Sequence, residues 1–263
     1  MSEPRRLASS TSPEVAAQGG VLLVPLGSTE QHGPHLPVDT DTRIAVAVCE
    51  RVARDRAEVC VAPAVAYGSS GEHAGFAGTL SIGQEALELV VLELVRSAGP
   101  EWRAIVLVNG HGGNSDALSR ALRTLQHEAR PVTAWSPTFS GGDTHAGATE
   151  TSMMLALDPD CVRRDEIVVG DTRPLAELMP ALRDGGLRAV TANGVLGDPR
   201  SATAAEGERL LDSLAASLGV VVDGQLRLVP DGDATAGATA PTPITVGAST
   251  ASGPSGADRS GRR

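Results

Sequence analysis

Short, almost continuously apolar segments alternate along the chain with longer segments in which apolar residues recur at helical spacing. The apolar segments are residues 21–26, 59–62, 104–108 and 132–135. Because polar residues do not alternate with apolar ones in them, we expect strands that are buried on both faces, as in a parallel sheet. The segments with helical period are residues 43–54, 84–97, 114–129, 149–157 and 203–218. This order predicts an α/β fold, with a mostly parallel sheet between helices on both of its faces.

The two ends of the chain differ in composition from this alternating region. Residues 230–263 are mostly Ala, Thr, Gly, Ser and Pro, and Ile244 and Val246 are their only large apolar residues. Such a segment buries too little apolar surface to offset the entropy lost on folding. We therefore expect a disordered tail there, a disordered N-terminal segment over residues 1–19, and one folded domain over residues 20–229.

Composition excludes several classes of protein. All 22 basic side chains are Arg, against 32 acidic ones, and the net charge is −10. Without Lys the chain has no P-loop lysine, no pyridoxal Schiff base and no lysine nucleophile. The negative charge disfavours nucleic acid and anionic membranes as partners. The three Cys are widely spaced and no apolar stretch has the length of a signal peptide or a membrane span, so we expect a cytoplasmic protein.

Five of the six His residues lie in polar or glycine-rich loops, several of them after predicted strands. They are His32, His35, His73, His111 and His145. The sixth, His127, lies in a segment of helical period, where a surface position explains it. Ligands of parallel α/β proteins bind beyond the carboxyl ends of the strands. The five loop histidines therefore predict a common site.

The loop after the first predicted strand, GSTEQHGPHLPVDTD, is the richest in potential metal ligands. It holds Glu30, His32, His35, Asp39 and Asp41. Its prolines prevent a regular helix and impose a turning path, which can aim several side chains at one point. Imidazole together with carboxylate suits zinc, iron or manganese. In the alternative interpretation these side chains only face solvent or cap the following helix.

Two further loops supply the rest of the predicted site. In NGHGGN the glycines allow a sharp turn that projects His111 over a strand end, although such a turn could also bind a phosphate. In DTHAGATETS, His145 and Glu150 stand five residues apart at the start of a predicted helix. Glu150 either faces the metal site or interacts only with the helix dipole.

Four motifs together resemble the creatininase family of metal-dependent amidohydrolases. They are PLGSTEQHGPHLPVDTD, HAGFAGTLSIG, NGHGGN and HAGATETSMMLAL. The resemblance covers about residues 20–220, and implies a three-layer α/β/α sandwich and a homo-oligomer. It also implies two divalent metal ions, zinc or iron with manganese as a further candidate. The implied ligands are Glu30, His32, Asp41 in a bridging position, and His111.

One position departs from the creatinine-hydrolysing members of that family. They carry a metal-binding carboxylate two residues after the NGH histidine, where this chain has Gly113. The resemblance implies that Glu150 joins the metal ligands instead, with a catalytic role as well. His145 matches the family position for proton transfer and is our candidate for protonating the leaving nitrogen, with Glu150 or Asp39 as alternatives. We expect four residues to orient ligands or contact substrate: His35, Asp39, His73 and Trp135.

Hydrolysis of an amide C–N bond is the reaction that such a site predicts, because a metal both activates water and polarises the carbonyl. YGSSGEHAGFAGTLSIG and NGVLGDP resemble most one branch of the family. This branch consists of peptidases that cleave a modified, ribosomally made precursor peptide, releasing its C-terminal Val-Tyr-derived unit for redox-cofactor biosynthesis. Two alternatives stay open: hydrolysis of a small cyclic amide or formamide, and, outside enzymes, a phosphate- or nucleotide-binding module.

Overall fold

The computed structural model describes residues 3–138 and 143–228. Within them, the sheet has four parallel strands in the order β2-β1-β3-β4. The strands are β1 (Gly20–Leu26), β2 (Val59–Val61), β3 (Trp102–Asn109) and β4 (Val132–Trp135). In the register, Leu23 pairs with Val61 on one side and with Val106 on the other. The four predicted strands are confirmed to within two residues at each end.

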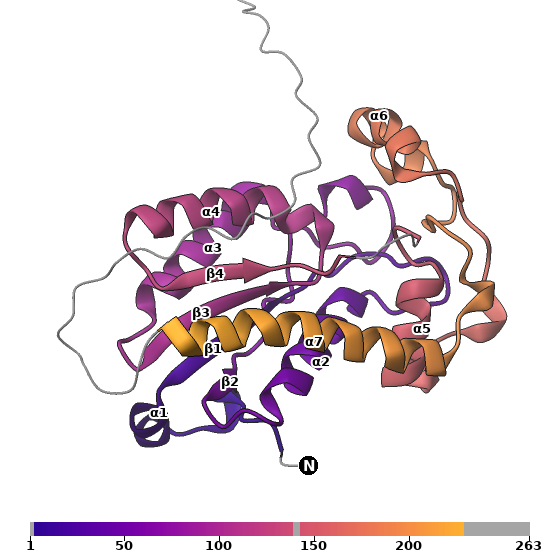
Figure 1. Cartoon of the computed structure of the whole chain (residues 1–263). Helices are drawn as coiled ribbons and strands as arrows, with labels where there is room; N and C mark the ends of the chain where they lie inside the picture. Colours follow the sequence, from indigo (N-terminus) through magenta and orange to yellow (C-terminus); the bar gives the residue numbers. More distant parts are fainter. Residues whose placement is uncertain (1–2, 139–142, 229–263) are drawn as a thin grey trace, which may run out of the picture. The chain divides into compact units, whose positions relative to one another are not determined.

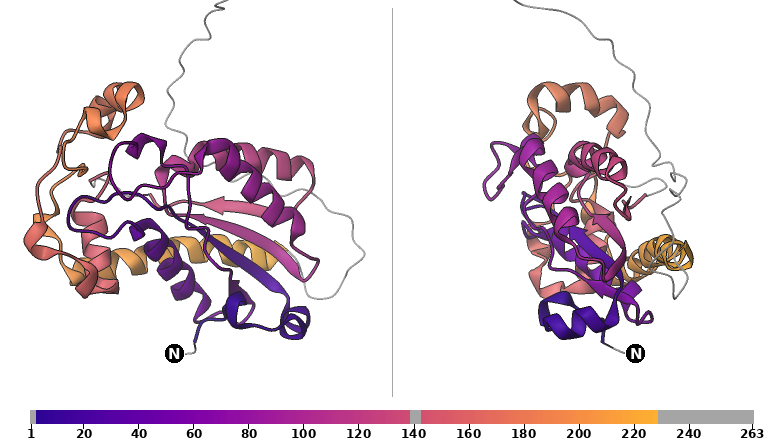
Figure 2. Two further views of the ribbon diagram at one scale, coloured as in Figure 1. Left: turned by 180° about the vertical axis from the view of Figure 1, so that it is seen from behind. Right: turned by 90° about the vertical axis from the view of Figure 1, so that its left-hand side faces the viewer.

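Helices cover both faces of the sheet (Figure 1). Val21, Leu23 and Val106 face a layer formed by α2 (Thr40–Ala53), α5 (Ala148–Leu157) and α7 (Ala204–Leu228). Leu22 and Leu107 face α3 (Gly83–Ser97) and α4 (Ser115–His127) on the other side. Because helices pack against both faces of the sheet, the three-layer α/β/α sandwich expected from the sequence is confirmed. Figure 2 shows the two helical layers from further directions.

Helix α7 is longer than the predicted segment 203–218. Its last turns are held by Val222, which is completely buried, and by Asp223, whose carboxylate accepts a hydrogen bond from Arg56 Nε at 2.8 Å. These contacts join the end of α7 to the chain after α2. The apolar pattern of the sequence weakens there, whereas the tertiary contacts continue the helix.

The N-terminal segment differs from the expected disorder over residues 1–19. It contains η1 (Leu7–Ser9) and α1 (Ser12–Gln18), and α1 begins with a capping box formed by Thr11 and Glu14. The Val61 N–H donates to Arg5 C=O at 2.9 Å, so this segment pairs with β2 at the edge of the sheet. Covering an edge strand satisfies its free backbone groups, which explains the order. The expected disordered tail lies outside the described residues.

A further helix, α6 (Leu175–Gly185), was not predicted. Pro180 lies inside it and Leu178 is its only buried residue among those described, so the sequence carries little helical signal. Leu178 packs with Leu187 and Leu196 in a small apolar cluster, away from the sheet (Figure 1). The described residues also contain six short 3₁₀ segments after the N-terminal one: η2 (Gly71–His73), η3 (Gly112–Asn114), η4 (Pro159–Cys161), η5 (Arg164–Glu166), η6 (Leu187–Ala189) and η7 (Pro199–Ser201).

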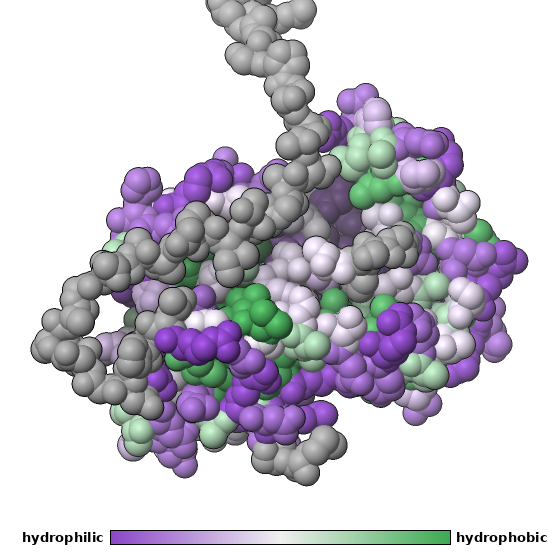
Figure 3. Space-filling model, viewed as in Figure 1, coloured by the Kyte–Doolittle hydropathy of each residue, from purple (hydrophilic) through white to green (hydrophobic). Residues whose placement is uncertain are grey.

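The surface seen in Figure 3 is mainly hydrophilic, with apolar residues interspersed. In the described part of the chain, no helix is both long and apolar enough to cross a membrane. The loops that follow β1 and β3, together with η2 and the loop before α5, contain the loop histidines. The fold therefore collects these loops at the carboxyl ends of the strands, as expected for a parallel sheet.

Candidate metal centre

Residues from four segments converge beyond the ends of β1 and β3. Glu30 and His32 lie in the loop after β1, Asp41 in the first turn of α2, His111 directly after β3, and Glu150 in the first turn of α5. All except Glu150 are buried, and Glu150 is partly buried. Asp41 and Glu150 each lie near a helix N-terminus, which favours a negative charge. The structure thus brings together the five ligands named from the sequence.

Two asparagines hold the loops of the site in place. Asn109 Nδ2 donates to His111 C=O at 2.9 Å, which fixes the turn after β3. Asn114 donates to Gly27 C=O at 3.0 Å and accepts from the Ser69 N–H at 2.9 Å. Asn114 therefore ties the loop after β1 to the segment before η2. This explains chemically why both ends of NGHGGN are Asn.

A first group of ligands consists of Glu30, Asp41 and His111. His111 Nδ1 lies 3.2 Å from Asp41 Oδ2, and His111 Nε2 lies 3.1 Å from Glu30 Oε2. One ligand atom from each residue can be chosen so that all three lie within 4.8 Å of one another. This separation suits three ligands of one cation.

A second group consists of His32, Asp41 and Glu150, whose ligand atoms also lie within 4.8 Å of one another. His32 Nε2 lies 3.0 Å from Asp41 Oδ1 and 3.9 Å from Glu150 Oε2. Asp41 therefore belongs to both groups and directs one oxygen to each histidine. A carboxylate in this position can bridge two cations, which agrees with the bridging position implied by the resemblance.

Hydrogen bonds orient these ligands. His32 Nδ1 lies 3.1 Å from Glu30 C=O, a contact that requires the proton on Nδ1 and leaves Nε2 free for a cation. Ser28 Oγ donates to Asp41 Oδ2 at 2.8 Å, and the Ala146 N–H donates to Glu150 Oε2 at 2.6 Å. Such outer hydrogen bonds fix the ring tautomer and the orientation of metal ligands.

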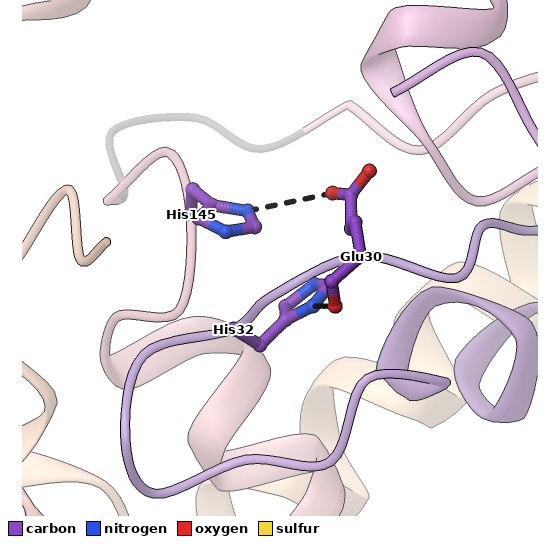
Figure 4. Close-up of side chains that lie close together, drawn as sticks. All are labelled: Glu30, His32 and His145. Atoms are coloured by element: carbon purple, nitrogen blue, oxygen red, sulfur yellow. Dashed lines mark hydrogen bonds and ion pairs between the residues drawn. The ribbon is translucent and has the colours of Figure 1, made fainter. Parts of the chain in front are cut away.

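His145 lies beside the two groups, in the loop before α5. Its Nε2 lies 2.9 Å from Gln31 C=O, and its Nδ1 lies 3.9 Å from Glu30 Oε1. Figure 4 shows its ring facing Glu30, with His32 below them in the same space. The bond to Gln31 C=O requires the proton on Nε2. Nδ1 is therefore the nitrogen that can gain a proton at the site.

His73 and Gln31 complete the wall around Glu30. His73 Nε2 lies 3.3 Å from Glu30 Oε1, and Gln31 Nε2 lies 3.1 Å from His73 Nδ1. Gln31 also donates to Gly194 C=O at 3.0 Å, which connects the site to the loop after α6. Sequence reasoning missed Gln31. The only signal for it was its position between Glu30 and His32.

Burial and charge shift the pKa values of the ligands strongly. Burial, followed by the Asp41 charge, raises the pKa of Glu30 to about 8. Burial alone would lower the pKa of the histidines, but Asp41 outweighs it and raises the pKa of His32 to about 10 and of His111 to about 9. Burial would raise the pKa of Asp41, yet the two histidines hold it well below its usual range. Burial raises the pKa of Glu150 to about 7.

The other histidines shift in the opposite direction. Burial, with the charge of His32, lowers the pKa of His73 to about 3 and the pKa of His145 well below its usual range. The same causes lower the pKa of His35 to about 4. These rings are therefore neutral near pH 7 and can accept a proton or bind a cation.

The buried carboxylate of Glu30 tests whether the site fits a metal. Imidazole nitrogens of His111 and His73 lie 3.1 Å and 3.3 Å from its two oxygens, but among the described residues neither oxygen takes part in a hydrogen bond. Burying a carboxylate without hydrogen bonds is costly. A divalent cation between Glu30 and its neighbours would satisfy it, and nitrogen with carboxylate oxygen is a donor set for zinc, iron or manganese. The residues present fit such a cation.

Two of the expected substrate or support residues lie elsewhere. The Asp39 side chain pairs with Arg43 at 2.8 Å and is 44% exposed, so it is held at the surface by its own helix. Trp135 is buried in the core between β4 and α7, where its Nε1 donates to Ser217 Oγ at 3.2 Å. Neither belongs to the groups of potential ligands. Asp39 is therefore held by a surface ion pair and Trp135 by the core, and their roles in substrate binding or ligand support stay predictions.

His35 supports the site from behind the potential ligands. Its ring is completely buried, and Nε2 lies 2.9 Å from Thr151 Oγ1 in α5. It thereby joins the loop after β1 to the helix that carries Glu150, which is a supporting contact. His127 is exposed at the end of α4, as expected from its helical segment.

Fold and site together define a metal-dependent amidohydrolase of the α/β class. Residues 8–222 match the model of the creatininase family, described as creatinine amidohydrolase, and the chain belongs to this family. The family expected from the four motifs is therefore confirmed.

Curated relatives include a particular peptidase. The mycofactocin precursor peptide peptidase of Mycolicibacterium smegmatis is 55% identical over 214 residues, covering 79% of this chain and 86% of that protein. A protein of the same name from Mycobacterium tuberculosis is 51% identical over 218 residues, with coverage of 79% and 86%. The creatinine amidohydrolase of Pseudomonas putida is 32% identical over 230 residues, with coverage of 75% and 86%.

Solved structures share the fold. A creatininase mutant described as Zn-Zn type has a TM-score of 0.71 at 27% identity, covering 85% of this chain and 99% of that chain. A structure described as creatininase Mn has a TM-score of 0.70 at 28% identity, with the same coverage. Both are named with a metal, which agrees with the donor set described above.

Proposed function

We propose that this chain is a metal-dependent peptidase that hydrolyses an amide bond of the modified mycofactocin precursor peptide. The reaction would release the C-terminal Val-Tyr-derived unit used in redox-cofactor biosynthesis. The main support for metal-dependent hydrolysis is that Asp41 belongs to both groups of potential metal ligands. The peptide substrate is supported by the 51–55% identity to relatives named for it.

In this proposal the site holds two divalent cations, of zinc or iron with manganese as a further candidate. Glu30, Asp41 and His111 would hold one, and His32, Asp41 and Glu150 the other. Cations at this place would supply Lewis acidity for the attack of water on an amide carbonyl. The carboxylates supply the negative charge that balances them, and the buried surroundings keep competing water away.

His145 is the proposed proton donor to the leaving nitrogen. An amide nitrogen leaves poorly unless it is protonated, and the donor must stand beside the site without being fixed by a strong ion pair. His145 Nε2 is bound to Gln31 C=O, whereas Nδ1 faces the site. The ring is neutral near pH 7, so it would first take up the proton that the attacking water loses, and its lowered pKa then favours transfer of this proton to the leaving nitrogen. Glu150 is assigned as a ligand because its Oε2 is held towards His32 by the Ala146 N–H.

The charge of the site opposes the phosphate-binding alternative. Glu30 and Asp41 lie beside His111, the histidine of the glycine-rich turn, and without a cation these carboxylates would repel a phosphate there. The small-amide alternative has weaker support, because the relative named creatinine amidohydrolase is 32% identical, against 55% for a peptidase relative.

A cleavage assay tests the proposal. Metal-loaded protein is incubated separately with the modified precursor peptide, the unmodified peptide, creatinine and a formamide, and products are identified by mass spectrometry. We expect cleavage of the modified peptide with loss of its C-terminal unit, and its abolition by a chelator. Hydrolysis of creatinine or of the formamide, with the peptide left intact, would overturn the proposed substrate. Action in the cytoplasm on a ribosomal product, as a homo-oligomer, is part of the same proposal.

A further inference from the structure

Glu72 brings an additional carboxylate to one half of the site. It lies in η2, and its Oε1 is 3.5 Å from His111 Nε2. Glu30, Glu72 and His73 also form a group whose ligand atoms lie within 4.8 Å of one another. The Glu72 side chain is 37% exposed, so it stands at the open side of the site.

Gly113 makes this approach of Glu72 possible. A Cβ at position 113 would lie 2.3 Å from Glu72 Oε1, 2.3 Å from Ser69 C=O and 2.4 Å from His111 Nε2. Gly113 is not among the glycines with positive φ, so its backbone does not itself require glycine. The requirement is one of space, because the segment from Ser69 to Glu72 fills the volume into which a side chain would project.

The surroundings of Glu72 point to a cation. His111 Nε2 faces three acceptors: Ser69 C=O at 3.0 Å, Glu30 Oε2 at 3.1 Å and Glu72 Oε1 at 3.5 Å. One N–H cannot satisfy all three. Glu30 is completely buried, is aimed at the same place, and has no hydrogen bond to either carboxylate oxygen within the described residues. Two buried or half-buried carboxylates this close repel each other unless a positive charge lies between them.

We propose that Glu72 is a further protein ligand of the cation held by Glu30, Asp41 and His111. This inference rests on the proposed function in one respect, because it requires the cation that the proposed function places there. Two ligand atoms that each lie about 2.0–2.2 Å from one tetrahedral cation are about 3.4 Å apart. The distances from His111 Nε2 to Glu30 Oε2, 3.1 Å, and to Glu72 Oε1, 3.5 Å, are close to this value.

Metal titration of the full chain tests this ligand. Metal-depleted wild type, Glu72→Gln, Glu72→Asp and Glu85→Gln are titrated with Zn²⁺ by calorimetry and with Mn²⁺ by electron paramagnetic resonance. Glu85 is a matched control because it is an exposed glutamate at the start of the neighbouring helix α3. Circular dichroism checks that each variant is folded.

We expect wild type and Glu85→Gln to bind two equivalents of metal. Glu72→Gln should weaken one of them by at least about tenfold and change the Mn²⁺ spectrum, leaving the other equivalent as in wild type. Glu72→Asp should recover part of the affinity. If folded Glu72→Gln binds both equivalents as tightly as Glu85→Gln does, the inference fails and the proposed function stands. A wild type that binds no metal would instead overturn the proposed function.

Discussion

The two halves of the metal centre are built differently. In the half around His32, hydrogen bonds from the chain fix the ligands: His32 is bound to Glu30 C=O and Glu150 to the Ala146 N–H. In the half around His111, Glu30 has no hydrogen bond among the described residues, and acceptors crowd around one imidazole nitrogen. The protein therefore preorganises one half with hydrogen bonds, whereas the charges of the other half need bound protons or a cation to balance them. Asp41 belongs to both halves, so its loss should erase the difference between them.

The largest effect is expected for Asp41→Asn. Removing the shared charge should abolish binding of both metals and reduce kcat/KM by at least about a thousandfold, which corresponds to about 4 kcal/mol. Metal content is measured by mass spectrometry and activity with the modified peptide. Asp39→Asn is the control, because Asp39 pairs with Arg43 at the surface and such pairs contribute about 0–1 kcal/mol. An Asp41→Asn protein that keeps one full equivalent of metal would show that the halves are independent.

His145→Asn should reduce kcat without removing metal from either half. General acid catalysis contributes about 10²–10⁴-fold, so a loss of this size is expected for the peptide. An activated ester of the same acyl group needs no protonation of its leaving group, and its hydrolysis should fall much less. Equal losses for amide and ester would contradict the proton-donor role, as would loss of metal from the variant.

Glu150→Gln sharpens the comparison because it alters only the preorganised half. We expect the affinity for one metal equivalent to fall by about 10–100-fold or more, while the equivalent at His111 is kept. Calorimetric titration with Zn²⁺ of metal-depleted protein resolves the two equivalents. Weakening of both to the same extent would mean that Glu150 supports the whole site.

A smaller effect is expected from pH on the metal-free protein. The pKa of Glu30 rises from 4.5 to about 8, chiefly because the side chain is buried. Burial would lower the pKa of His111 and His32, but the charge of Asp41 opposes it. The pKa of His111 therefore rises from 6.5 to about 9 and that of His32 to about 10. From pH 7 to 9 these groups hold more protons in the folded than in the unfolded state, so the free energy of unfolding falls as pH rises. The histidines with lowered pKa do not oppose this, since above pH 7 they are largely neutral in both states.

Thermal denaturation at pH 7, 8 and 9 measures this dependence. The Tm of the metal-free protein should fall across the range. Zinc takes the place of the bound protons, so the Tm of the zinc-loaded protein should fall less. A metal-free Tm that rises from pH 7 to 9 would contradict the assigned charges.

Periodicity was sufficient to predict the sheet and the helices that cover it, because strands such as β1 are buried on both faces and therefore almost wholly apolar. It failed for α1 and α6. Helix α1 is held by the contact of its segment with the edge of β2, and α6 contains Pro180 and buries little. Both helices bury few or none of their described residues, so no apolar period marks them in the sequence.

Part of the candidate site was also predictable, because several of its residues directly follow parallel strands. Glu30, His32 and His111 stand in loops directly after strands, and parallel strands end at one edge of the sheet. Asp39 was grouped with them because it is close in sequence, but the first turn of α2 directs Asp41 inward while Asp39 pairs with Arg43. The approach of Glu72 to Gly113 depends on the packing of two loops and has no signal in either segment alone.

The central claim is that Asp41 joins two metal sites. X-ray diffraction from crystals of the zinc-loaded protein, with data collected at the zinc absorption edge, tests it most directly. We predict two anomalous peaks, one beside each Asp41 carboxylate oxygen, with His32 and Glu150 next to one and Glu30 and His111 next to the other. A single peak, or peaks away from Asp41, would contradict the account.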